Sequence, residues 1–243
     1  MPAQKTPPTG YEWMLSLSTE GWAWEFLRRN PGYQEDFVKF AQAPAIDRQR
    51  QAAKWGLLDI TDPTADARSA LVFWKPEDNP SVLPLVAQRS DRKSLLSSVT
   101  CTRTQLSHTE RGQRHVLYSC SGRYLQLVIS GDCDEGRATY LVDPLPEKGA
   151  DRRILSLRKL SDLAHHKRLR AHLYVRQRRG PRFAHLAMVL DAYAQDTSHR
   201  SIAHAVYGSA VAERDWDFLR DHVRRAVAAG KRLTQGGYLR LLA

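Results

Sequence analysis

The sequence predicts an α+β protein made of a small aromatic helical domain, a short antiparallel β meander and a basic helical domain with a helix-turn-helix. Charge is the first observation, because the last 93 residues carry 19 Lys and Arg against 8 Asp and Glu and hold the whole net charge of +11. The second is an aromatic N-terminal segment, and the third is a change to helical apolar spacing near residue 150. Together they predict an N-terminal domain over 10–86, a linker over 87–113 and a C-terminal region over 114–243.

The N-terminal domain is predicted to begin with two short helices. Ser18 or Thr19 offers a capping hydroxyl to a helix that begins near Glu20, and Asn30-Pro31 ends that helix because a residue before proline leaves the α region. A second helix is expected over 33–41. Large side chains are expected to form the core of this small domain rather than a ligand cage, and they are Trp13, Trp22, Trp24, Tyr33 and Trp55.

The middle of the chain has short β-like runs around a polar stretch. The linker is assigned to this stretch because it is rich in Ser, Thr, Arg and Gln and has little periodicity. Gly122 can supply positive φ in a short connection between two strands. The β-like runs are 71–74 and 82–86 before the linker, and 116–120, 124–129 and 138–142 after it, of which the last three form the expected meander.

The basic half is predicted to be helical. Apolar residues recur at helical spacing over 154–173, with Arg and Lys between them, and a basic turn follows at 178–182. Three further helices are expected near 186–193, 199–207 and 211–229, with Gly208 after the second and Gly230 as the stop of the third.

The last two of these helices have the pattern of a helix-turn-helix. The short helix contains Ile202-Ala203, and the small Ala203 lets two steeply crossed helices approach closely. In such a motif, the helix after the turn enters the major groove of DNA. We therefore expect double-stranded DNA as the partner, contacted by His199, Arg200, Arg214, Arg220, Arg224, Arg225, Lys231 and Arg232.

Several stretches near both ends of the sequence resemble known protein families. Asp215-Trp216, Val223-Arg224-Arg225, Gly230-Lys231-Arg232 and the run from Gly236 to Leu242 resemble the DNA-binding domain of the RovC-like transcription factors. The run from Gly21 to Pro31, with Trp55-Gly56-Leu57 and Phe73-Trp74-Lys75-Pro76, resembles a small proteobacterial transcriptional-regulator domain. The two-part arrangement is similar to the FseA-type activators of integrative and conjugative elements, which switch on an excision factor.

This resemblance implies a bacterial transcriptional activator without catalytic residues. It is compatible with control of excision or transfer genes of a mobile element and with restraint by a small anti-activator protein. Contact with RNA polymerase is a further partner compatible with activation. An activator that reads repeated half-sites is usually at least dimeric, so a homo-oligomer also fits.

Two other functions remain open from the residues alone. His165-x-x-Arg168 and His222-x-x-Arg225 match parts of a tyrosine-recombinase signature, with Tyr238 as the nucleophile of a DNA enzyme. A regulatory module that binds an acidic protein would also use a basic surface.

Composition excludes some classes of site. The three scattered cysteines lack Cys-x-x-Cys spacing, and His165, His166 and His172 have no ligand set around them, so we expect no metal and no cofactor. The chain has neither an apolar run that could span a bilayer nor a signal peptide. These features predict a cytoplasmic protein without membrane contact.

Overall fold

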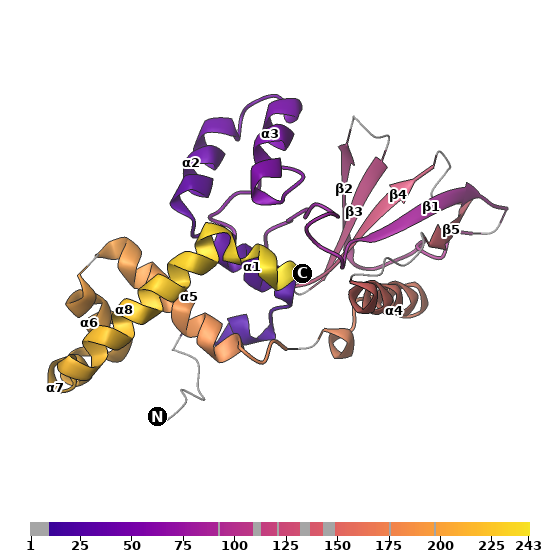
Figure 1. Cartoon of the computed structure of the whole chain (residues 1–243). Coiled ribbons are helices and arrows are strands. Elements are labelled where there is room, and N and C mark those ends of the chain that lie inside the picture. Colours follow the sequence, from indigo (N-terminus) through magenta and orange to yellow (C-terminus); the bar gives the residue numbers. More distant parts are fainter. Residues whose placement is uncertain are drawn as a thin grey trace. The chain divides into compact units, whose positions relative to one another are not determined.

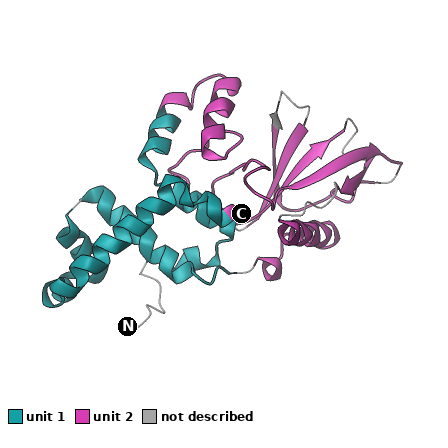
Figure 2. Ribbon diagram, viewed as in Figure 1, with its two compact units in different colours: residues 1–38, 176–241 teal, residues 39–175, 242–243 magenta. Residues whose placement is uncertain are grey.

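Helices lie at both ends of the sequence, and strands lie in its middle. The two compact units of the chain do not correspond to consecutive stretches of this sequence. The computed structural model describes residues 10–91, 93–108, 113–120, 122–131, 137–142, 149–174, 176–196 and 198–243. The chain divides into two units (Figure 2): unit 1 joins Met1–Val38 to Arg176–Leu241, and unit 2 joins Lys39–Val175 to Leu242–Ala243. The predicted boundaries near 86 and 113 therefore differ from those of the units.

Unit 1 is helical, and its helices come from both ends of the chain (Figure 1). The N-terminal part contributes η1 (Glu12–Ser16), α1 (Thr19–Leu27) and most of α2 (Pro31–Phe40). The C-terminal part contributes α5 (Gly180–Gln195), α6 (His199–Tyr207), α7 (Ser209–Arg214), α8 (Trp216–Arg232), the π-helical η5 (Leu233–Gly237) and most of α9 (Leu239–Leu242).

The first helix begins as the sequence predicts but ends at Leu27, before Asn30-Pro31. The Ser18 hydroxyl caps α1 and accepts a hydrogen bond from the Gly21 amide at 3.3 Å. Proline is tolerated in the first turn of a helix, and Pro31 both ends the preceding segment and begins α2. The Asn30 side chain accepts a hydrogen bond from the Tyr33 amide at 3.2 Å, which satisfies one donor at the start of α2.

The aromatic core of unit 1 includes a helix from the basic half. Trp22 and Phe26 are fully buried, and the Phe183 ring of α5 meets them edge-on at centroid distances of 5.4 and 5.6 Å. A partly buried ion pair joins the same parts, because Arg29 Nε donates to Asp191 Oδ1 at 2.7 Å. Of the predicted core residues, Trp22, Trp24 and Tyr33 are buried, whereas Trp13 and Trp55 are half-buried. The Trp22 part of this core is shared with α5.

Unit 2 contains α3 (Ala45–Ala52), η2 (Ala53–Trp55) and a five-stranded sheet. The strands are β1 (Leu83–Arg89), β2 (Thr102–His108), β3 (Gln113–Cys120), β4 (Arg123–Ser130) and β5 (Ala138–Val142), in the order β2-β3-β4-β1-β5.

The sheet is mixed, so the prediction of a simple antiparallel meander is wrong. Strands β3 and β4 form the expected antiparallel pair, and Gly122 between them has a φ of +71°. However, β1 lies between β4 and β5, parallel to β4 and antiparallel to β5. Residues 87–113, predicted as a linker, contain the end of β1 and all of β2, which pairs with β3. The predicted strand at 71–74 is reduced to one bridge between Leu57 and Trp74.

Helix α4 (Ala150–His166) packs on one face of this sheet, and η4 (Ala171–Leu173) follows it (Figure 1). Leu160 and Leu163 are buried in the same cluster as Leu83 and Leu127 of the sheet. The basic half of the sequence is thus divided between the two units. No helix in the part of the chain that the structure describes is long and apolar enough to cross a membrane.

Candidate nucleic-acid interface

Three helices of unit 1, α5, α6 and α8, pack against one another to form the candidate interface. Ile202 and Ala203 of α6 are buried, as the sequence predicts. Gly230 does not end α8. It lies inside the helix, where an added Cβ would come within 2.8 Å of Leu190 Cγ of α5. Its small size therefore permits the close approach of α5 and α8.

The predicted third helix is divided into two. Helix α7 ends at Arg214, and Asp215, with φ −110° and ψ 22°, separates it from α8. The Asp215 carbonyl then accepts a hydrogen bond from the Leu219 amide at 2.9 Å and begins the new helix. Trp216 at the start of α8 is half-buried, and the Arg200 guanidinium lies 5.6 Å from its ring centroid.

One side of α8 is apolar and the other is charged. Leu219, Val223, Ala226 and Val227 are buried at helical spacing. At 3.6 residues per turn, the cations follow two rows along the opposite side. One row contains Arg220, Arg224 and Lys231, the other contains Arg225 and Arg232, and Asp217, Asp221 and Ala228 lie between them.

Two of the predicted contacts carry an acidic neighbour. Arg214 Nη2 lies 3.0 Å from Asp215 Oδ2, and this guanidinium lowers the pKa of the Asp215 carboxyl by a hydrogen bond. Arg224 Nη2 lies 3.3 Å from Asp221 Oδ1. All four side chains are largely exposed, so these pairs contribute little stability and can exchange for another anion.

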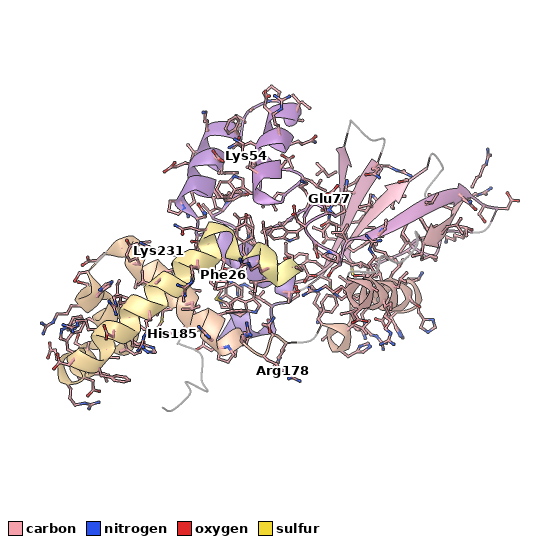
Figure 3. All side chains as sticks on the ribbon, viewed as in Figure 1. Phe26, Lys54, Glu77, Arg178, His185 and Lys231 are labelled. Carbon is pink, nitrogen blue, oxygen red and sulfur yellow. The ribbon has the colours of Figure 1, made fainter. Side chains whose placement is uncertain are left out.

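The remaining predicted contacts differ in exposure. Arg200, Arg220, Arg225 and Arg232 are exposed, whereas His199 and Lys231 are half-buried. Lys231 Nζ donates to the Tyr193 hydroxyl at 2.7 Å and lies 4.0 Å from the Tyr193 ring centroid (Figure 3). Lys231 therefore links α8 to α5 besides carrying charge at the surface.

The end of α8 near α7 is acidic. A hollow of about 600 Å³ lies there, and its lining has three carboxylates against two guanidiniums. The lining residues are Arg200, Glu213, Arg214, Asp215, Trp216, Asp217 and Phe218. Since DNA phosphates avoid carboxylates, the C-terminal half of α8 is electrostatically better suited to a polyanion than this end.

A group of titratable rings lies between the three helices, and no pattern in the sequence indicates it. The rings of His185, Tyr207 and His222 have centroid separations of 5.8 to 6.2 Å, and the Tyr207 hydroxyl is 3.2 Å from His185 Nε2. Burial, with a smaller contribution from His222, lowers the pKa of His185 to about 4. Burial raises the pKa of Tyr207 to about 12. Both groups are therefore neutral near pH 7.

No set of metal ligands was found in the described parts of the chain. Among those residues, no group of three or more His, Cys, Asp or Glu side chains is arranged to hold a metal ion. The surface instead offers guanidiniums and one ammonium on a rigid helical support, which is the chemistry that binds phosphate oxygens and guanine edges.

Comparison with known families agrees with that chemistry and indicates a DNA-binding transcription regulator. Residues 144–243 match the model of a T6SS transcription factor DNA-binding domain, and residues 5–58 match that of a proteobacterial transcriptional regulator-like domain. The chain is similar to both families in those parts. No curated protein and no solved structure gives a significant match. Each matched region has residues in both units, so these domains and the units do not coincide.

Proposed function

We propose that the chain is a sequence-specific transcriptional activator that binds double-stranded DNA through α5, α6 and α8. In this proposal α6 and α8, with the short helix α7 between them, act as the two helices of a helix-turn-helix, and α8 enters the major groove. The supporting observation is the division of α8, with its apolar side packed in unit 1 and five Arg and Lys residues along its other side.

The predicted contacts fall into two roles. Arg214, Arg220, Arg224 and Arg225 are placed to read base edges, because a guanidinium donates two hydrogen bonds to guanine. His199, Arg200, Lys231 and Arg232 lie near the ends of their helices, where contacts to the DNA backbone would flank a docked α8. Arg224 must exchange Asp221 for its DNA acceptor, and Arg214 must exchange Asp215.

Genome-wide binding of the tagged protein tests the regulatory role. We expect peaks at promoters, and a single peak near an excision-factor gene would support control of a mobile element. Binding spread evenly over the genome would contradict sequence specificity. Once a site is known, transcription from that promoter with purified RNA polymerase tests activation, and repression there would contradict it.

Partners other than DNA follow from the same proposal. An activator can contact RNA polymerase and can be restrained by a small anti-activator protein, and paired half-sites would require a homo-oligomer. Sedimentation of the protein with and without its DNA site measures the oligomeric state. Equal half-sites occupied by one protomer each would support a dimer.

Tyr238 bears on the recombinase alternative. Its side chain is only 2 % exposed, and a nucleophile must reach the scissile phosphate. We therefore favour regulation over strand cleavage. Incubation with a suicide DNA substrate checks this, because a covalent complex lost in Tyr238→Phe would support the enzyme.

Salt dependence separates DNA binding from binding of an acidic protein. Neutralising about five phosphates gives a log-log slope near −4.5 for duplex DNA. An affinity for DNA that stays flat between about 50 and about 200 mM salt would favour the protein-binding module.

A further inference from the structure

A second cluster of cations lies in unit 1 outside α6 and α8. Residues 176–182, named here the basic turn, include four arginines within seven positions and lead into α5. All four side chains are exposed, and they are Arg176, Arg178, Arg179 and Arg182. Arg178 projects from this turn in Figure 3.

The charge of the basic turn is not neutralised by neighbours. In the part of the chain that the structure describes, none of its four arginines forms an ion pair, whereas Arg214 and Arg224 each have an aspartate partner. Four guanidiniums in so short a segment repel one another. An anion that binds there relieves this repulsion and loses nothing to a competing carboxylate.

The backbone of the basic turn is firmly held. The Gly180 amide donates to the Gln177 carbonyl at 2.8 Å, and the Phe183 amide donates to the Arg179 carbonyl at 2.9 Å, so the turn continues directly into α5. Three residues later, Phe183 is buried against Trp22 and Phe26. The N-terminal helices thus fix the position from which the arginines extend, which lowers the entropy lost on binding.

We infer that the basic turn binds the sugar-phosphate backbone of duplex DNA as a second, sequence-independent contact. This inference rests on the proposed function and adds an anchor outside α8. A guanidinium pairs with phosphate oxygens through two parallel hydrogen bonds, and such contacts position a protein without reading bases. The N-terminal helices then support DNA binding without touching DNA themselves.

The test uses the full chain and a mixed-sequence duplex of about 30 base pairs, with fluorescence anisotropy read from about 50 to about 200 mM salt. Arg178→Ala/Arg179→Ala should make the log-log salt slope shallower by about 1.8, since each lost phosphate contact removes about 0.9. The loss of affinity should be equal on any duplex sequence. Arg178→Lys/Arg179→Lys should retain the slope.

A matched control removes two exposed cations from unit 2. Arg50→Ala/Lys54→Ala lowers the net charge equally and should leave the slope unchanged. Thermal unfolding followed by circular dichroism should give the same Tm for every variant, because the altered side chains are exposed.

The outcomes distinguish the anchor from the proposed function. An unchanged slope in Arg178→Ala/Arg179→Ala, together with weaker binding by Arg225→Ala, overturns the anchor alone. Absence of salt-dependent DNA binding by the wild-type chain overturns the proposed function itself. Tighter binding to an RNA duplex of the same sequence also overturns the anchor, because the turn would then serve RNA.

Discussion

Helices α4 and α8 are both 17 residues long and both basic, yet they use their cations differently. In α4, Lys159 is buried, and its ammonium lies 4.3 Å from the Tyr174 ring centroid. Just after α4, Lys167 Nζ donates to the Ser97 carbonyl at 3.2 Å. In α8, four arginines remain exposed on the charged side. A basic sequence therefore shows where cations occur along the chain. Only the packing shows which of them are buried in a structural role and which are exposed to a ligand.

The positive charge of the basic half is also divided between the two units. Residues 151–175 carry 7 Lys and Arg against 2 Asp and Glu, and 176–243 carry 12 against 6. The positive excess of the basic half is thus nearly halved, with +5 in its part of unit 2 and +6 in its part of unit 1. If the comparison holds, loss of cations should affect folding in α4 and DNA binding in α8.

The largest expected effect is on DNA affinity. Arg225→Ala/Arg232→Ala removes one row of α8 and should weaken binding about 100-fold or more, since each DNA contact contributes about 1–3 kcal/mol. Arg158→Ala/Arg168→Ala removes two exposed arginines of unit 2 and should change affinity less than about threefold. Anisotropy titrations of both variants measure this, and equal losses would end the distinction between the helices.

The next effect is acid sensitivity of the α5, α6 and α8 packing. The pKa of His185 is lowered to about 4 from an ordinary value of 6.5, so the unfolded chain binds more protons between these values. The free energy of unfolding should fall as pH drops through this window, by about 2 kcal/mol. Urea unfolding at several pH values measures the fall.

His185→Gln is the control for the acid effect. It keeps a polar side chain of similar length without a titratable group, so most of the slope between about pH 6.5 and pH 4 should disappear. A slope that persists in this variant would assign the sensitivity to other groups.

A smaller effect on stability is expected in α4. Lys159→Ala removes a buried stem and its contact with Tyr174, and should lower the free energy of unfolding by about 1–2 kcal/mol. DNA affinity should be unchanged. The exposed neighbour in Arg158→Ala should alter stability by less than about 0.5 kcal/mol. Denaturant titration compares the stabilities of the two variants. Weaker DNA binding by Lys159→Ala, measured where this variant is fully folded, would contradict the structural role of Lys159.

The smallest effect separates two arginines near α8. Arg214→Ala should relax sequence preference by only a few-fold, because Asp215 competes for its guanidinium. Arg225→Ala should relax it by about tenfold, since no such neighbour is paired with it in the described structure. Competition between the DNA site and a single-base variant of it measures the sequence preference of each protein variant. A larger loss of preference in Arg214→Ala than in Arg225→Ala would show that Asp215 does not compete for the guanidinium.

Local patterns allowed part of this structure to be predicted. The Ser18 cap, the helix with Ile202-Ala203 and the β3–β4 pair depend on neighbours in sequence, and each is found. The insertion of β1 between β4 and β5 depends on a long-range register, which local periodicity does not contain. The prediction of Gly230 as a helix stop is wrong because the packing partner of this glycine, Leu190, lies 40 positions earlier in the sequence.

The candidate site was predictable in chemistry and less so in detail. Positive charge and helical spacing indicated α8 and its arginines, because both are visible along the sequence. The pairing of Arg214 with Asp215, the Tyr193 contact of Lys231 and the ring cluster at His185 depend on side-chain geometry. The shared core of Phe183 with Trp22 depends on two segments some 160 residues apart, and no local rule joins them.

The assembly of unit 1 from two distant segments has a consequence for synthesis. The Asn30 side-chain amide Nδ2 donates to the Thr234 carbonyl at 2.8 Å, across 204 positions of sequence. On the ribosome, unit 2 can therefore complete its sheet while Trp22 and Phe26 still lack their partner from α5. The chain can then bind DNA only after its final helices have emerged. A translation product interrupted before that point would have a folded sheet and an exposed aromatic segment that is prone to aggregate.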